Sequence, residues 1–298
     1  MGAFEISMCL FFGLIGTITL HLAKALERHG IDLFNRKMSR QEKGKKPLIW
    51  FIGFGLNNTQ FIWQLIGNSF APAGVYVSVF GIGLVIVLIY SVRILKEDMT
   101  KWDWMGSCLI MVGTLLVGFL LFNRPEIVAP AINYEAFTIL MISSAIVLTS
   151  LLAFSFWRKT AISLFFGLVA GSCGAIDNIL KHSGLQEGNL WIIAVSFVIG
   201  FLAFLITQWG FANKADASKL VPAYNSSYII IPVLFEAVII VSPFTQIQPL
   251  QLLAIAIIIL GVVCMTAIKK WKLGSKSPEI EVKKKRIVLK DELVFKIP

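Results

Sequence analysis

The amino-acid sequence predicts an all-α polytopic membrane protein of about nine transmembrane helices, arranged as an inverted 4+1+4 repeat. Three observations support this fold class: the composition, the recurrence of long apolar stretches, and a similarity between the two halves of the chain. Of the 298 residues, 57% are apolar and 15% are charged, whereas a soluble domain carries about a quarter charged residues. Since a spanning backbone must satisfy its own hydrogen bonds, apolar stretches of this kind are expected to be helices.

Each predicted span is an apolar stretch of about twenty residues, which is long enough to cross the hydrocarbon layer as a helix. The first stretch begins close to Met1 and is expected to be a helix and not a signal peptide, because it has no basic leader and no clear cleavage site. The nine spans are 4–26, 48–68, 72–94, 103–123, 135–156, 160–181, 190–211, 219–241 and 249–269.

The positive charges indicate an orientation in the membrane. The net charge is +10, and Lys and Arg fill the odd-numbered loops and the C-terminal tail, whereas Arg124 and Lys181 fall in or beside even-numbered loops. By the positive-inside bias, the N-terminus is predicted outside and the C-terminus in the cytoplasm. The basic excess is therefore explained by topology, so the expected partner is the lipid bilayer and not nucleic acid. Lys24, near the inner end of span one, is expected to extend its side chain to the cytoplasm.

The two halves of the chain share an ordered set of sequence landmarks. Phe-Phe-Gly-Leu occurs at 11–14 and again at 165–168, and Ala-Pro-Ala at 71–73 is matched by Val-Pro-Ala at 221–223. Spans one to four are therefore predicted to repeat as spans six to nine, and span five inverts the second set in the membrane. Inverted repeats are typical of secondary transporters. Duplication of a purely structural bundle is the alternative.

This repeat predicts one membrane domain followed by a tail. The expected divisions are a domain at 1–270, with repeat one at 4–123, a linker helix at 135–156 and repeat two at 160–269, and a basic cytoplasmic tail at 271–298.

Of the acidic residues within predicted spans, Asp177 and Glu236 lie deepest, about four and five residues from the outer ends. A charge that faces lipid costs several kilocalories, so each is expected to face the helix interior or a wet cavity. Asp177 and Asn178 give span six an oxygen-rich end that could bind a cation or exchange a proton. Asp177 and Glu236 are the candidate metal ligands, and the alternative for Asp177 is a structural hydrogen bond at the interface.

Other polar side chains fall within spans two, seven and eight. Span two carries Asn57, Asn58, Thr59 and Gln60 near its middle, and at least two of them should face a cavity or another helix, because consecutive helical positions point in different directions. Hydrogen bonding between helices is the alternative role. The candidate substrate-binding residues are Asp177, Asn178, Glu236, Asn57, Asn58, Gln64, Gln208, Tyr224 and Asn225. Since the sequence has no metalloprotease spacing, nucleophile elbow or phosphate-binding loop, neither an enzyme nor a cofactor is expected.

Two stretches of the chain resemble the drug/metabolite transporter superfamily. In 208–232, Gln208 is followed by Asn-x-Ala-x-Ala and then by Val-Pro-x-Tyr, and in 70–118 the pair Lys96-Glu97 stands at a helix end before a Gly-ended apolar helix. The closest likeness is to EamA-like proteins of the NIPA type, and it extends over most of 10–269. The resemblance implies a bundle of inverted repeats that moves small solutes, or Mg²⁺ and other divalent cations. One departure is that the second-half equivalent of the Lys-Glu pair, near Thr245, has no acid.

The sequence therefore predicts a secondary transporter or facilitator of a small solute that works by alternating access, with a divalent cation such as Mg²⁺ as the first candidate. The alternatives are a proton-coupled exporter of a small metabolite in the same superfamily, and a membrane scaffold or sensor that transports nothing. The sequence also leaves a homodimer open.

Overall fold

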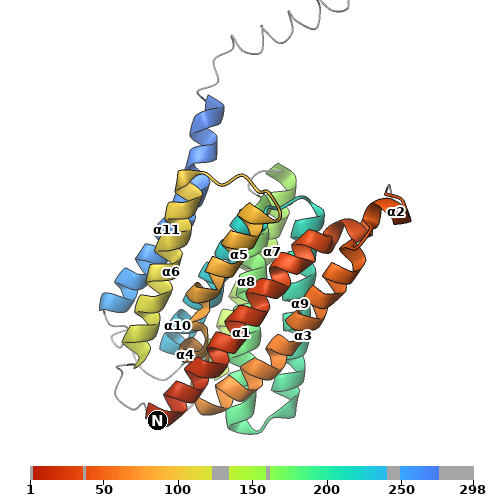
Figure 1. The fold of residues 1–298 in the computed structure, drawn as a ribbon. Helices are drawn as coiled ribbons and strands as arrows, with labels where there is room; N and C mark the ends of the chain where they lie inside the picture. Colours follow the sequence, from red (N-terminus) through yellow and green to blue (C-terminus); the bar gives the residue numbers. More distant parts are fainter. Residues whose placement is uncertain (1–2, 36–37, 123–133, 159–161, 240–248, 275–298) are drawn as a thin grey trace, which may run out of the picture. The chain divides into compact units, whose positions relative to one another are not determined.

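The computed structural model describes residues 3–35, 38–122, 134–158, 162–239 and 249–274, and each element in these ranges is a helix, which confirms the all-α class (Figure 1). The long helices are α1 (Ala3–Gly30), α3 (Lys46–Phe70), α5 (Phe80–Arg93), α6 (Lys101–Phe122), α7 (Tyr134–Arg158), α8 (Ile162–Glu187), α9 (Leu190–Ala212), α10 (Ala217–Ile239) and α11 (Pro249–Gly274). The short elements are the 3₁₀ helix η1 (Ile31–Phe34), α2 (Arg40–Lys43) and α4 (Ala73–Val77).

The chain divides into two units, Met1–Met265 and Thr266–Pro298. The functional candidates all fall in the first unit. Of the predicted basic tail at 271–298, the residues after Gly274 lie outside the described part of the chain.

Several helices of the first unit are suited to a bilayer. Among the residues that the structure describes, five segments are long and apolar enough to cross a membrane: Ala3–Phe34, Ala73–Arg93, Lys101–Leu120, Ile162–Glu187 and Leu190–Ala212. The chain is thus a multi-pass integral membrane protein. The other predicted spans coincide with α3, α7, α10 and α11.

The predicted continuous helix at 72–94 is wrong in one respect, because the structure divides it into α4 and α5. Both the backbone N–H and the hydroxyl of Ser78 donate to the carbonyl of Val75, at 3.3 and 2.7 Å. These two bonds close a tight turn and end α4 after little more than one turn of helix. A Cβ at Gly118 of α6 would lie 2.8 Å from Ser78 Cβ, so α6 approaches this turn closely.

Helix α8 extends further than the predicted span at 160–181, and this changes the depth of Asp177. The helix continues through Lys181 to Glu187, and Gly188 follows with a φ of +64°, a left-handed conformation that glycine adopts without strain. Ten residues, and not four, separate Asp177 from the helix end, which is about 15 Å at 1.5 Å per residue. Asp177 therefore lies well inside helix α8 and not in its last turn.

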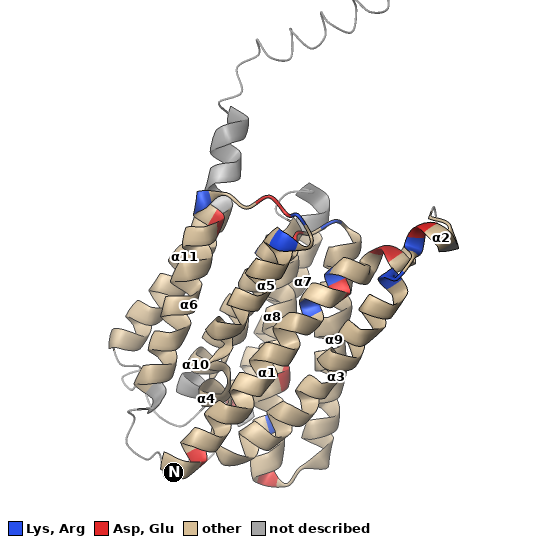
Figure 2. Cartoon of the chain, viewed as in Figure 1, with Lys and Arg blue, Asp and Glu red and all other residues tan. Residues whose placement is uncertain are grey.

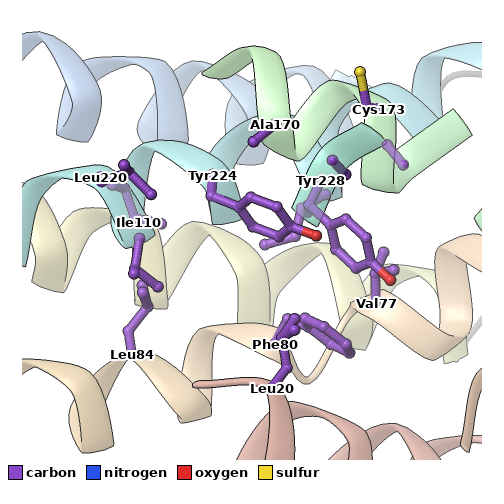
Figure 3. Packing of buried hydrophobic residues seen from close by; sticks show 14 of the residues in the cluster. Leu20, Val77, Phe80, Leu84, Ile110, Ala170, Cys173, Leu220, Tyr224 and Tyr228 are labelled. Atoms are coloured by element: carbon purple, nitrogen blue, oxygen red, sulfur yellow. The ribbon is translucent and has the colours of Figure 1, made fainter. Parts of the chain in front are cut away.

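The helices pack as two groups that meet at an aromatic core. Helix α1 packs on α3 and α5, α8 packs on α9 and α10, and α5 also contacts α10. At that contact, Phe80 stacks on Tyr228 with ring centroids 4.9 Å apart, and Tyr228 stacks on Tyr224 at 5.5 Å (Figure 3). The three rings connect the two groups next to the site described below.

Candidate functional site

A cavity of about 230 Å³ lies among α1, α3, α8, α9 and α10. Its wall combines charged groups, amides and aromatic rings, and it draws on helices from both halves of the chain. The lining residues are Leu20, Lys24, Phe54, Asn57, Asn58, Gln60, Phe61, Gln64, Gly174, Asp177, Lys181, Phe197, Gly200, Phe201, Ala203, Phe204 and Tyr224.

One side of the cavity holds a buried ion pair on α8. Lys181 Nζ donates to Asp177 Oδ2 at 2.6 Å and to Gln64 Oε1 at 2.6 Å, so the ammonium joins α8 to α3. Gln64 in turn donates through Nε2 to the Tyr228 hydroxyl on α10. A Cβ at Gly200 of α9 would lie 2.9 Å from Asp177 Oδ2, so only a residue without a side chain lets α9 cover this carboxylate.

A second buried carboxylate, Glu27 on α1, lies behind the cavity wall, where it is bonded to the lining residue Asn57. Its two oxygens accept hydrogen bonds from Asn57 Nδ2 at 3.0 Å and from Gln208 Nε2 at 2.6 Å. Gln208 Oε1 accepts a further bond from Trp50 Nε1 at 3.0 Å. This network fixes α1, α3 and α9 to one another and uses both oxygens of Glu27.

Lys24 does not extend to the cytoplasm, and that expectation is wrong. Its side chain lies in the cavity wall with 2% of its surface exposed, and Nζ is 3.8 Å from the centroid of the Tyr224 ring. The aromatic face attracts the ammonium, and the cavity gives it room. Inside the protein, this side chain has both a contacting partner, the Tyr224 ring, and free space in the cavity, so it does not extend to the membrane surface.

The structure brings five of the nine predicted site residues to the cavity: Asn57, Asn58, Gln64, Asp177 and Tyr224. Gln208 lies one step behind the wall, bonded to Glu27. Asn225 is fully buried beside His21. The side chain of Glu236 lies outside the described part of the chain, so its predicted role as a metal ligand stays a prediction.

Asn178 has a structural position and does not line the cavity. Its Oδ1 accepts from Asn68 Nδ2 at 2.7 Å, and its Nδ2 donates to the carbonyl of Ala73 at 3.4 Å. These bonds join α8 to the end of α3 and to the start of α4. The neighbouring residue Asp177 points instead to the cavity, because adjacent helical positions differ by about 100°.

Sequence reasoning missed Glu27 and Lys181 as site residues. Both are buried, with 0% and 3% of their surfaces exposed. A signal existed in the spacing: Lys24 and Glu27 stand three positions apart, and Asp177 and Lys181 stand four apart, so each pair shares one helix face. A charge near the end of an apolar span also fits the membrane surface, so its place in the chain alone does not reveal the buried pairs.

The described part of the chain holds no group of three or more His, Cys, Asp or Glu residues that could bind a metal ion. The cavity instead presents two ammonium groups, Lys24 and Lys181, with the carboxylate of Asp177 already paired at 2.6 Å. Together with the amides of Asn57 and Asn58, this wall can hold a small polar solute and can exchange hydrogen bonds with it.

Glu97 connects the two halves of the chain away from the cavity. Its oxygens accept the backbone N–H groups of Ala217 and Ser218, both at 2.8 Å, at the start of α10, and Arg28 Nε on α1 lies 3.7 Å from Oε1. A carboxylate at a helix N-terminus satisfies free N–H groups and favours the helix dipole. Lys96, with a φ of +56°, forms the turn that precedes Glu97. The Lys96-Glu97 pair that carries the family resemblance therefore has a physical role in this fold.

Replacement of Glu97 with alanine should lower the free energy of unfolding by about 1–2 kcal/mol, because two N–H groups of α10 lose their acceptor. Denaturant unfolding in detergent, followed by tryptophan fluorescence, measures the change. Asp98→Ala is the matched control, since this neighbouring carboxylate is exposed and should shift stability by less than about 0.5 kcal/mol. Equal changes in the free energy of unfolding for the two variants would show that Glu97 does not cap α10.

The fold and the site define a class of protein: a multi-pass helical membrane protein with a polar, charged cavity between its helices. Comparison with known proteins gives a more particular likeness. Residues 6–119 match the model of the EamA-like transporter family. The chain is also 32% identical over 117 residues to "Probable magnesium transporter NIPA9" of Arabidopsis thaliana, a match that covers 38% of this chain and 33% of that protein. The chain thus matches about a third of the length of this curated relative.

No solved structure matches the chain. The resemblance to EamA-like and NIPA-type proteins that the sequence predicted is confirmed by both sequence comparisons. The family match covers α1 to α6, which are the helices of the predicted first repeat.

Proposed function

We propose that this protein is a secondary transporter or facilitator that moves a small solute across a membrane by alternating access. The observation that carries the proposal is the cavity of about 230 Å³, whose charged wall is built jointly by α1 and α3 and by α8, α9 and α10. Buried ionisable groups in a membrane protein are costly and typically mark a transport pathway. The likeness to the EamA-like transporter family gives independent support.

The proposed mechanism rests on the inverted 4+1+4 repeat of nine spans within 1–270. Its support is that α8 contacts α9 and α10 as α1 contacts α3 and α5. The glycines of the repeated Phe-Phe-Gly-Leu motif behave alike: a Cβ at Gly13 would meet the Tyr76 carbonyl oxygen, and a Cβ at Gly167 would meet the Leu220 carbonyl oxygen. Rocking of two such halves about a central site opens it to each side in turn.

The proposed orientation places the N-terminus outside and the C-terminus in the cytoplasm. Figure 2 shows Lys and Arg gathered at the end of the first unit that carries α2 and the start of α6, whereas they are sparse near the N-terminus. This distribution supports the positive-inside argument.

A divalent cation such as Mg²⁺, the first cargo candidate from the sequence, is supported by the likeness to the Arabidopsis protein. On this alternative, Asp177 and Glu236 would be the ligands. Mg²⁺ keeps much of its hydration shell and needs only one or two carboxylates. Against it, the two ammonium groups of Lys24 and Lys181 in the cavity wall would repel a cation.

The experiment that tests the proposed function is a flux assay in proteoliposomes that contain the purified protein. The panel comprises labelled Mg²⁺, Co²⁺, small organic acids, amino acids and neutral sugars, with protein-free liposomes as the blank. We expect protein-dependent flux of at least one solute, and a loss of at least tenfold in Asp177→Asn, which removes the counter-charge of Lys181. Flux of Mg²⁺ alone would select the cation, and absence of all flux would leave a scaffold or sensor.

A further inference from the structure

Lys24 is the charged group in the cavity wall that has no counter-ion in contact. In the described part of the chain its ammonium contacts the Tyr224 ring, 3.8 Å from the centroid, and forms no salt bridge. Lys181, by comparison, has both Asp177 and Gln64 at 2.6 Å. Both lysines are at least 97% buried, so the difference between them is one of partners and not of exposure.

The carboxylate that could neutralise Lys24 is already engaged elsewhere. Glu27 lies three residues further along α1, but its oxygens are held by Asn57 at 3.0 Å and by Gln208 at 2.6 Å. Gln208 is itself held by Trp50, so the network cannot turn toward the cavity without breaking bonds on three helices. Glu27 therefore attracts the Lys24 ammonium without contacting it. The ammonium remains available for direct contact with an anion in the cavity.

A buried ammonium without a contacting anion is a costly arrangement, and an anionic ligand that enters the cavity would relieve it. Lys presents a compact single charge, without the planar fork that Arg uses for bidentate phosphate binding. Since Lys181 is already paired, the cavity offers one ammonium group without an anion in contact, which suits a monoanion better than a dianion.

The other residues of the cavity wall indicate the chemistry and size of the uncharged part of the ligand. Five phenylalanine rings line the cavity, from Phe54 and Phe61 on α3 and from Phe197, Phe201 and Phe204 on α9. The volume of about 230 Å³ is below the range of about 300–1,000 Å³ that holds drug-sized ligands. The ligand is therefore small, and the part that follows its charged group is apolar.

We infer that the cargo of this cavity is a small monocarboxylate, with its carboxylate on Lys24 Nζ and its apolar body against the phenylalanine wall. This inference rests on the proposed function, since it names the substrate class of that site. It also explains the cation–π contact with Tyr224, because the ring holds the ammonium in place while the site is empty.

The test compares acids with their uncharged amides, which have almost the same shape. The probes are acetate, butyrate, hexanoate and benzoate, each paired with its primary amide, and binding to the detergent-purified protein is measured by isothermal titration calorimetry. We expect at least one acid of the series to bind at least tenfold more tightly than its amide. If no acid of the series binds better than its amide, the inference is overturned, and this comparison requires no variant.

Two variants then assign the charge to its residue. Lys24→Gln should weaken binding of the preferred acid at least tenfold and leave its amide unchanged, whereas Lys24→Arg, which keeps the charge, should stay within a few-fold of the wild type. Unchanged acid binding in a folded Lys24→Gln protein would overturn the assignment. Binding in detergent does not require transport, so this test can succeed or fail independently of the proposed function. A protein that binds the acid but moves no solute in liposomes would support the monocarboxylate site and contradict transport.

Discussion

Asp177→Leu is expected to lower the free energy of unfolding by about 3–5 kcal/mol, because breaking one half of a buried ion pair leaves an uncompensated charge. Lys181 would keep the amide oxygen of Gln64, at 2.6 Å, but would have no carboxylate in contact, while 3% of its surface is exposed. Thermal and denaturant unfolding of the purified protein in detergent measure the loss.

The double variant Asp177→Leu with Lys181→Met distinguishes the effect of an unpaired charge on stability from the effect of changed side-chain shape. Removal of both charges should recover most of the lost stability, since apolar replacements of a buried pair are often neutral. The matched control is the surface pair Asp216 and Lys219, whose atoms are 3.0 Å apart but whose side chains are 35% and 18% exposed. Asp216→Leu should cost about 0–1 kcal/mol. A double variant as unstable as Asp177→Leu alone would show that the cavity needs this carboxylate for a reason other than charge.

Gly171→Ala is expected to destabilise the protein by about 1–3 kcal/mol or more, because an added methyl group has no space between α8 and α10. The new Cβ would overlap with the Tyr224 carbonyl oxygen and the Ser227 hydroxyl. That hydroxyl donates to the Leu168 carbonyl at 2.8 Å, so separation of the two helices would also break this bond between them.

Gly55→Ala is the control with the opposite expected sign. An added Cβ at Gly55 has nothing within 4 Å, and alanine favours a helix over glycine by up to about 1 kcal/mol. The same unfolding assay should therefore report a gain for Gly55→Ala and a loss for Gly171→Ala. Two losses of similar size would mean that the close approach of α8 and α10 contributes little to stability.

The class of fold and the buried position of Asp177 could both be predicted from the sequence. A carboxylate inside an apolar stretch has one low-cost location, the protein interior, so its side chain had to face inward. The polar run of span two was equally informative, and Asn57, Asn58 and Gln60 do line the cavity. These predictions depend on local composition and helical geometry alone.

The roles of Lys24, Glu27 and Lys181 depend on contacts between distant parts of the chain, and for that reason they were missed. A lysine near a span end has two destinations of similar cost, the membrane surface or a buried partner. Only the approach of Tyr224 on α10 and of Gln64 on α3 decides between them. The division of α4 from α5 was hidden for the same reason, because the apolar sequence continues through the turn at Ser78.

The four buried charges near the cavity have a consequence for the response of the protein to membrane voltage. With their ordinary charges, Lys24 and Lys181 balance Glu27 and Asp177, so the centre of the empty protein is electrically neutral. Each elementary charge moved across 100 mV is worth about 2.3 kcal/mol. On the proposed alternating-access mechanism, the return of the empty protein should thus be almost insensitive to voltage, and the current carried by a full cycle would report the charge of the cargo itself.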